Sequence, residues 1–388
     1  MPYTKNPISK PPFGGWNDSA PSAVLQASSF RQITNWMIRY NRIHPFFQTS
    51  LWAEQSILGS STLMNARTFT DQQGFIHTFL LTDTGWGEIV PGVAGAPYTI
   101  TNVPWTAAYP TYTASQLFSV VVFNGQLYFA NGAIPLTMFK GDGNVYAVGG
   151  NNPNSTPPLI PVGDFPGSAF FLAAFSDRLL ALNTVEPYSL LPGSTNFPST
   201  IRYSAVNNGL EWDFTVDTSA GEFIISDAED ALSGWVTINQ TGFAFRRNGI
   251  TAISATGNQL VPFFVENFSV GPNGVGAFLP YCLSAYGTIA CFVAQDDVYT
   301  FSGGAPQAIG STARRSIFRD LGTSSSTPFG LMVGSFGQFV DYLTYWLVVP
   351  QASDTFSSLW IFHFDDKSWI NVHWPYGALR SVSNIATA

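Results

Sequence analysis

Acidic side chains between residues 211 and 230 are the first candidates for chemistry in this chain. They are Glu211, Asp213, Glu222, Glu229 and Asp230. Hydrolysis of a glycosidic bond needs two carboxylates that face each other across a pocket. These five lie together in one short stretch, an arrangement that does not place two of them on opposite walls of a pocket. The spacing therefore argues against a glycosidase.

A second motif with a chemical precedent is Asp83-Thr84-Gly85-Trp86, which resembles part of the Asp-box of sialidases. The tryptophan falls too close to the glycine, and no second copy is present in the sequence. A sialidase would also need an arginine cluster for its carboxylate substrate, whereas the 16 basic residues are scattered along the chain. We expect a protein that is not an enzyme.

Metal and cofactor chemistry is also disfavoured. Among His44, His77, His363 and His373, only the last two approach a ligand spacing, and no cysteine or acidic pair completes a site. The sequence has no Gly-x-Ser-x-Gly elbow, no P-loop and no dinucleotide fingerprint. We therefore expect no metal and no cofactor. Cys282 and Cys291 are expected to be two separate buried thiols, since two cysteines do not define a disulfide framework.

The densest basic cluster is formed by Arg314, Arg315 and Arg319. It falls in residues 311–321, the best candidate for a helix in the chain. Two interpretations remain open for it. The three guanidinium groups could face DNA in a channel, or they could form the solvated face of a helix, which is the commoner role of such a cluster.

Composition indicates a member of an assembly. Hydrophobic residues make up 45% and aromatic residues 15%, but charged residues only 10%, against about 25% in an average soluble protein. So few charges predict that partners cover part of the surface. The net charge of −8 argues against a surface built to bind nucleic acid. No apolar run approaches the ~18 residues of a membrane span, and the polar start of the chain lacks a secretory h-region, so we expect synthesis in the cytoplasm.

The elements that must position these residues are short strands. A hairpin phrase, in which an aromatic and a turn precede an apolar run, recurs at intervals of roughly 50 to 60 residues, as in β-propeller blades. Its copies are residues 123–129, 175–182, 242–250, 289–301 and 359–369. We predict an all-β fold, a β-propeller of about six blades. Residues 23–388 form this single domain, and residues 1–22, rich in Pro, Gly, Ser and Asn, form an extended arm.

Several strands can be predicted individually. Residues 75–81, 117–123 and 342–349 have strand patterns, and Tyr40-Asn41-Arg42 is predicted to turn a hairpin between two short strands. The strands near the amino terminus are candidates to close the ring. The pair Trp212-Asp213 is expected to be structural, with the tryptophan packed in a blade and the carboxylate capping a turn.

Six phrases in collinear order resemble a family of tailed-bacteriophage virion proteins, the β-propeller tail nozzle or packaged-DNA stabilisation proteins of the head–tail junction. They are residues 14–21, 30–46, 201–213, 242–250, 295–304 and 360–369. One departure concerns the family's basic Gly-Arg-x-x-Pro-Arg-Pro-Gly run, where this chain carries Phe46-Phe47-Gln48 in place of the second Arg-Pro-Gly.

The resemblance implies a structural protein in the virion tail, synthesised in the host cytoplasm. Copies of the chain would form a ring, sixfold by that resemblance, which extends or seals the DNA channel. Its partners would be other copies, the portal, adaptor or other tail proteins, and the packaged DNA. We expect contacts between subunits through the arm and through aromatic residues on loops, namely Phe13, Trp16, Trp86, Trp105 and Tyr112.

Two alternatives from other classes stay open. The first is a carbohydrate-binding or glycan-cleaving propeller at the tail tip. The second is a cellular propeller scaffold, against which the absence of a Trp-Asp repeat at each blade end counts.

Overall fold

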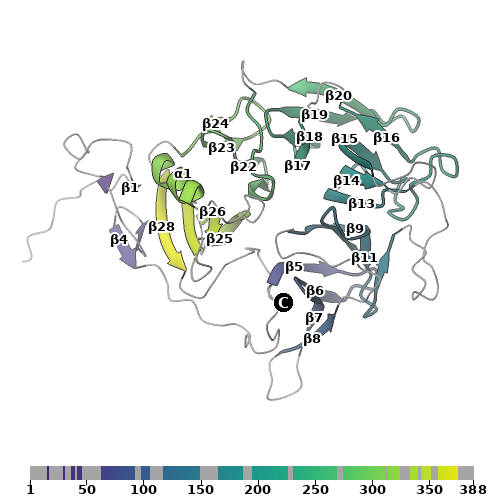
Figure 1. Ribbon diagram of the computed structural model, residues 1–388, viewed down its shortest axis with the longest axis horizontal. Helices are drawn as coiled ribbons and strands as arrows, with labels where there is room; N and C mark the ends of the chain where they lie inside the picture. Colours follow the sequence, from purple (N-terminus) through teal and green to yellow (C-terminus); the bar gives the residue numbers. More distant parts are fainter. Residues whose placement is uncertain are drawn as a thin grey trace, which may run out of the picture.

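Short strands joined by turns make up most of the described residues of the computed structural model (Figure 1). The structure describes residues 15–16, 29–30, 36–39, 42–45, 63–91, 98–104, 117–148, 165–186, 195–225, 230–268, 274–310, 313–323, 333–339, 342–350 and 357–374. Everything below refers to these residues.

Most of the strands form six sheets of four strands, and each sheet is a meander of four consecutive strands. Blade 1 consists of β5 (Leu63–Thr70), β6 (Ile76–Thr82), β7 (Gly85–Pro91) and β8 (Tyr98–Pro104). Blade 2 consists of β9 (Ser119–Phe123), β10 (Gln126–Ala130), β11 (Thr137–Phe139) and β12 (Val145–Ala147). Blade 3 consists of β13 (Ser168–Phe175), β14 (Arg178–Glu186), β15 (Thr195–Tyr203) and β16 (Gly221–Ile224). Blade 4 consists of β17 (Leu232–Ile238), β18 (Thr241–Arg246), β19 (Ile250–Ala255) and β20 (Phe263–Phe268). Blade 5 consists of β21 (Ser284–Tyr286), β22 (Ile289–Val293), β23 (Val298–Phe301) and β24 (Gln307–Ala308). Blade 6 consists of β25 (Val333–Phe339), β26 (Tyr342–Pro350), β27 (Ser357–His363) and β28 (Ser368–Trp374).

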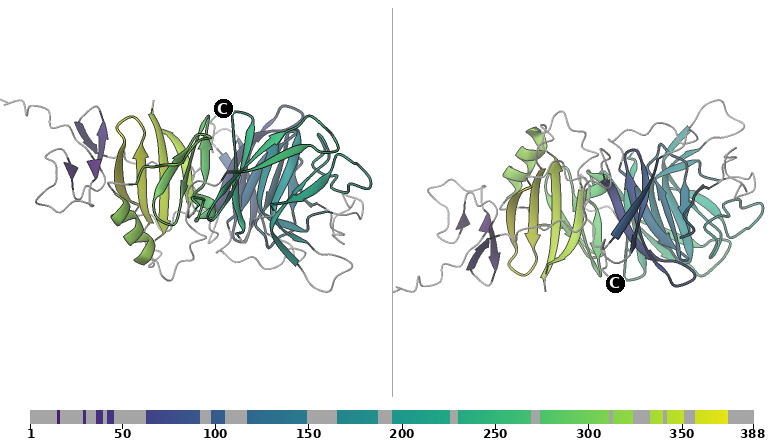
Figure 2. Two further views of the ribbon diagram at one scale, coloured as in Figure 1. Left: turned by 90° about the horizontal axis from the view of Figure 1, so that it is seen from above. Right: turned by 90° about the horizontal axis from the view of Figure 1, so that it is seen from below.

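The six sheets stand around a common centre, and seen edge-on they form a disc (Figures 1 and 2). The first strand of each blade lies innermost, so that β9 and β17 both lie beside β13, and β21 lies beside β25. This is a six-bladed β-propeller, which confirms the predicted fold. The predicted strands are present as β6, β9 and β26, and the predicted helix as α1 (Arg314–Thr323).

Aromatic side chains fill the spaces between blades. Phe79 of blade 1 packs on Phe139 of blade 2 with ring centroids 4.6 Å apart. Phe175 of blade 3 contacts Trp235 of blade 4 at 5.2 Å, and Phe245 of blade 4 contacts Phe292 of blade 5 at 5.1 Å. Because a single blade has no covered face of its own, this apolar contact between neighbours provides the core.

The centre of the ring is occupied by a short 3-10 helix, η3 (Pro280–Cys282). Tyr281, which is partly buried, donates a hydrogen bond to the Leu117 carbonyl at the start of blade 2 and packs against Phe171 of blade 3. The carbonyl of Cys282 accepts the hydroxyl of Tyr345, which belongs to blade 6. A single turn of chain thus connects blades that are far apart in sequence.

The recurring hairpin phrase does not mark one position in every blade. It forms the hairpin of the first and second strands in blades 2 and 3, of the second and third strands in blades 4 and 5, and of the third and fourth strands in blade 6. Two of the copies share a turn conformation. Asn124 and Gly125 in the first copy, and Ser176 and Asp177 in the second, all have positive φ, as a two-residue type I′ turn requires.

The strands near the amino terminus remain outside the six blades. β1 (Gly15–Trp16) pairs in parallel with β2 (Ser29–Phe30), and β3 (Trp36–Arg39) forms a hairpin with β4 (Arg42–Pro45), as the sequence predicted. β1 and β3 lie beside β28. Since each blade sheet in the described residues draws its four strands from one continuous segment, the prediction that these strands close the ring is wrong.

Candidate interaction surfaces

The predicted basic cluster lies on α1, at one flat face of the disc (Figure 2). Arg314, Arg315 and Arg319 are exposed, whereas Ser316 and Ile317 are buried and turn the other side of the helix toward blade 6. This amphipathic division explains why a helix forms here in an otherwise all-β chain. It agrees with the interpretation of a solvated helix face, and contact with DNA stays a prediction.

The predicted aromatic contacts have different outcomes. Trp86 lies on β7 and is only 5% exposed, because its ring stacks on Phe79 at 5.3 Å. The prediction that Trp86 projects from a loop is therefore wrong. Trp16 lies on β1, of which the structure describes the backbone, and Phe13, Trp105 and Tyr112 lie outside the described residues.

A stronger candidate is the outer hairpin of blade 4, which exposes a cluster of large apolar side chains. Leu260 is 75% exposed, Val261 60%, Phe264 62% and Val265 36%. We call these four residues the blade 4 rim. β20 is the last strand of its sheet and pairs only with β19 among the described strands, so its outer edge also presents unpaired backbone groups.

Local hydrogen bonds hold the rim in this exposed position. In the turn that precedes β20, the Thr256 hydroxyl donates to the Val261 carbonyl and accepts the Asn258 N–H. The side-chain oxygen of Asn258 accepts the Leu260 N–H at 2.9 Å. A turn fixed by its own polar side chains cannot fold Leu260 back onto the core.

The strand itself is anchored through Phe263, which points to the opposite face of β20 from Phe264. Phe263 is buried and packs against Tyr203 and Phe223 of blade 3, with ring centroids 5.2 and 5.7 Å away. Successive side chains of a strand alternate between its faces, so burial of Phe263 leaves Phe264 outside. Blade 3 adds further exposed apolar residues, with Phe214 56%, Val216 71% and Ile224 63% exposed.

The carboxylates singled out in the sequence have structural roles. Glu211 and Asp213 accept backbone N–H groups of Asp213 and Thr215, and Asp230 accepts that of Asn248. Glu222 lies 3.9 Å from the guanidinium of Arg202. Glu229 lies outside the described residues. Trp212 is 1% exposed and donates its indole N–H to the Gly209 carbonyl, so the structural interpretation of Trp212-Asp213 is confirmed.

A buried ion pair accounts for the arginine of the phrase at residues 201–213. Arg202, 2% exposed, contacts the carboxylate of the equally buried Glu186 at 3.1 Å. It also donates to the Trp212 carbonyl at 3.4 Å. Arg202 thus joins the middle of blade 3 to the segment that packs against its edge.

The Asp-box-like motif is the turn between β6 and β7. The Thr82 hydroxyl donates to the Gly85 carbonyl and accepts the Gly85 N–H, both at 2.9 Å. This tight turn places Trp86 in the core rather than at a substrate site.

Asp71, His77 and Glu88 form a cluster that was not predicted from the sequence. Nε2 of His77 lies 3.2 Å from Asp71, and Nδ1 lies 2.5 Å from Glu88. Burial lowers the pKa of His77, but hydrogen bonds and charge from Glu88 and Asp71 raise it, and its pKa lies above the ordinary value. Both ring nitrogens lie within hydrogen-bond distance of carboxylates, an arrangement that favours the protonated form of the ring.

The histidine on β27 and the cysteines of the described residues have the following surroundings. His363 pairs with Asp366 at 3.3 Å, and in the part of the chain that the structure describes no three His, Cys, Asp or Glu residues are grouped as metal ligands. Cys282 and Cys291 are both buried and free, as predicted. No helix among the described residues is long and apolar enough to cross a membrane.

Comparison with known proteins finds similarity to solved structures only. No family model matches the chain. No curated protein matches it either. Among solved structures, the extracellular domain of the hybrid two-component system BT4673 from B. thetaiotaomicron shares 10% identity with a TM-score of 0.47, over 84% of this chain and 35% of that one. A quinonprotein alcohol dehydrogenase-like protein from Bacteroides thetaiotaomicron shares 10% identity at a TM-score of 0.40, over 79% of this chain and 65% of that one. A mutant of AofleA from Arthrobotrys oligospora shares 12% identity at a TM-score of 0.34, over 87% and 77%. The chain thus spans about a third of the length of the first of these proteins and just under two thirds of the second.

Proposed function

We propose that this chain is a structural subunit of the tail of a tailed bacteriophage. Copies of it would form a closed ring at the head–tail junction or tail nozzle, and the ring would extend or seal the DNA channel. Two features of the sequence support this proposal, namely the six collinear phrases that resemble the phage family and a charged fraction of only 10%.

The observation that carries the assembly part of the proposal is the blade 4 rim. Contiguous exposed apolar side chains on a monomer usually mark a contact surface. Here they lie on an outer strand, whose far edge is unpaired among the described strands, and on the turn before it, where local hydrogen bonds hold Leu260 in place. A neighbouring subunit that covers Leu260 and Phe264 would remove this apolar area from water.

Such a contact would also cover apolar surface on a chain that carries few charges. Burial of the rim would be worth about 25 cal/mol per Å² of apolar surface. In a closed ring every copy contributes the same two complementary surfaces, so no rim is left uncovered. The face of α1 that carries Arg315 would then be available to the DNA channel or to the next tail protein.

The assembly is tested by native mass spectrometry of the purified full chain. We expect a discrete ring for the wild type and a shift to monomer for Phe264→Glu, because a charge would be buried without a partner. The control is Phe75→Glu, which changes an equally exposed phenylalanine on blade 1 (67% exposed) and should leave the ring intact. A wild type that stays monomeric at high concentration would contradict the assembly.

The location is tested separately, by immunogold labelling of intact particles from the source phage with antibody to the recombinant chain. One cluster of label at the tail vertex is expected. Particles that label for capsid protein but not for this chain would rule out a virion role, and the carbohydrate-binding propeller would become the leading alternative.

A further inference from the structure

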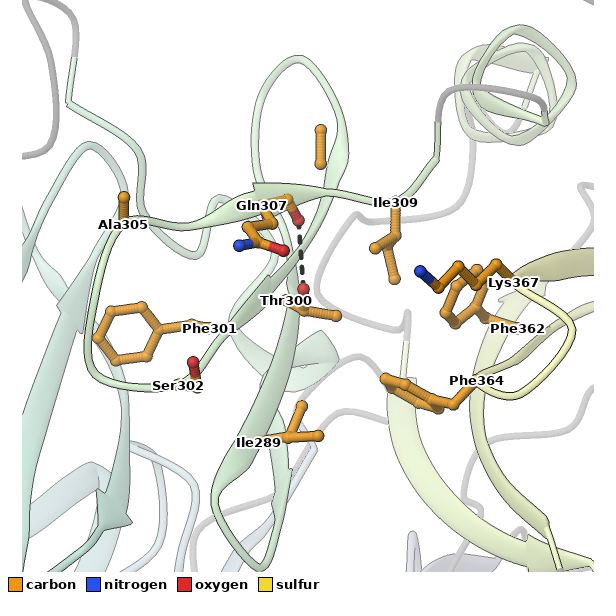
Figure 3. Close-up of a pocket in the computed structure, with 11 residues that line it drawn as sticks. Ile289, Thr300, Phe301, Ser302, Ala305, Gln307, Ile309, Phe362, Phe364 and Lys367 are labelled. Carbon is orange, nitrogen blue, oxygen red and sulfur yellow. Dashed lines mark hydrogen bonds between the residues drawn. The ribbon is translucent and has the colours of Figure 1, made fainter.

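A pocket of about 460 Å³ lies between blades 5 and 6 (Figure 3). Its lining combines apolar side chains with the polar residues Thr300, Ser302, Gln307 and Lys367. Blade 5 supplies Ile289, Thr300, Gln307 and Ile309, and the β27–β28 hairpin of blade 6 supplies Phe364 and Lys367. A pocket of this size and character is typical of small-molecule sites.

The pocket exists because the two blades differ in size. The outer strand of blade 5, β24, has two residues, whereas its counterpart in blade 6, β28, has seven. β24 pairs with β23 only at Tyr299 and Thr300. Beyond that point blade 5 ends, and the longer hairpin of blade 6 overhangs the space.

The walls of the pocket are fixed by contacts between the blades. The fully buried Trp369 donates its indole N–H to the Ile309 carbonyl at 2.8 Å. Phe362 packs on Trp369 at 5.2 Å and on Phe364 at 5.1 Å, and Thr300 donates to the Gln307 carbonyl at 3.4 Å. A ligand would therefore enter a preformed site and would not have to order it.

Lys367 brings a positive charge to this pocket. It follows Asp366 in the hairpin turn with φ of +48°, and Figure 3 shows its side chain extending across Phe362 toward Ile309. Asp366 is engaged with His363, and Lys367 itself has no hydrogen bond or ion pair with another described residue. The ammonium group is thus available to a ligand.

We infer that this pocket binds a small organic carboxylate with a flat apolar body. The body would lie against Ile289, Ile309 and Phe364, and the carboxylate would meet Lys367. An inorganic anion would leave the apolar walls unmatched, and a neutral apolar molecule would make no use of the cation. A sugar would lose hydrogen bonds of its hydroxyl groups against the apolar floor.

The experiment compares four probes, phenylacetate, phenylacetamide, acetate and glucuronate, by saturation-transfer NMR and calorimetry on the full chain. We expect phenylacetate to bind about fivefold more tightly than the isosteric phenylacetamide, as a partly exposed ion pair allows, and acetate to show no binding. Lys367→Met should abolish the preference for phenylacetate over phenylacetamide, and Lys367→Arg should keep it.

The matched control is Lys140→Met, which removes a lysine of blade 2 that pairs with Asp142, and it should bind phenylacetate as the wild type does. Equal affinity for phenylacetate and phenylacetamide in the wild type would overturn the inference. So would binding of glucuronate without phenylacetate, which would assign the pocket to a sugar. Because Lys367→Arg keeps the charge, its behaviour separates loss of the cation from loss of folding. The pocket does not depend on the proposed ring, and monomer and ring should give the same result.

Discussion

The hydroxyl of Tyr281 donates a hydrogen bond to the carbonyl of Leu117, 2.9 Å away and 164 residues earlier in the chain. This bond joins the central 3-10 helix to the start of blade 2, and the bond from Tyr345 to Cys282 joins the same helix to blade 6. A propeller of separate meanders depends on such contacts, since no sheet hydrogen bonds cross between blades in the described residues.

Removal of the Tyr281 hydroxyl should destabilise the protein measurably. Tyr281→Phe keeps the ring on Phe171 but leaves a buried carbonyl without its donor, which costs about 1–3 kcal/mol. Urea unfolding followed by fluorescence measures the effect. The control is Tyr299→Phe, whose hydroxyl bonds the carboxylate of Asp296 at an exposed position and should cost less than about 1 kcal/mol. Equal effects of the two variants would contradict a special role for the centre.

Gly334 is expected to tolerate no side chain. A Cβ there would lie 2.6 Å from the Cys282 carbonyl oxygen and 2.2 Å from the Tyr345 hydroxyl. Gly334→Ala should therefore lower the free energy of unfolding by about 1–3 kcal/mol, because the backbone oxygen cannot move aside without disturbing η3. Gly304→Ala is the control, since nothing lies within 4 Å of its Cβ position. Differential scanning calorimetry of both variants provides the comparison.

Removal of one partner of the Arg202–Glu186 ion pair should lower the free energy of unfolding much more than removal of both charges. Arg202→Met leaves a buried carboxylate without its partner and should cost about 3–5 kcal/mol. The double variant Arg202→Met/Glu186→Gln removes both charges and should recover part of this loss. Chemical denaturation of the wild type and of the two variants tests this prediction. A double variant as unstable as Arg202→Met alone would show that packing, and not charge, dominates at this position.

Stability should fall as the pH rises through the titration of His77. Its folded pKa is raised above 6.5, so the stabilisation is fully present below about pH 6.5 and is lost above it, as the pH passes the folded pKa. His77→Gln should lack this dependence. The measurement is the urea midpoint of both proteins from pH 6 to 8, a window that stays below the ordinary pKa of cysteine. Parallel curves for the two proteins would refute the assignment.

The sequence predicted local structure well and the meeting of distant segments poorly. Turn residues such as Asn124 and Gly125 carry their own conformational preference, so hairpins, strands and the six-bladed ring could be inferred from short phrases. Trp86 was misplaced because a turn motif does not reveal which face its neighbours cover. The cluster at His77 joins three strand or turn positions whose carboxylates look ordinary in the sequence.

The candidate surfaces show the same division. The exposed helix face of Arg314, Arg315 and Arg319 follows from its local pattern. The blade 4 rim could not be foreseen, because Phe263 and Phe264 are identical residues and only the packing of blade 3 decides which one is exposed. The pocket at Lys367 likewise depends on the unequal lengths of two outer strands.

The meander order of the blades has a consequence for how the protein is made. Each sheet is complete once its own fourth strand has left the ribosome, so the blades can form one after another during translation without waiting for the end of the chain. The centre is different, because the bond between Leu117 and Tyr281 cannot form before Tyr281 is synthesised. The bond between Cys282 and Tyr345 likewise cannot form before Tyr345 is synthesised. A nascent chain halted before residue 281 would therefore carry finished blades around an empty axis.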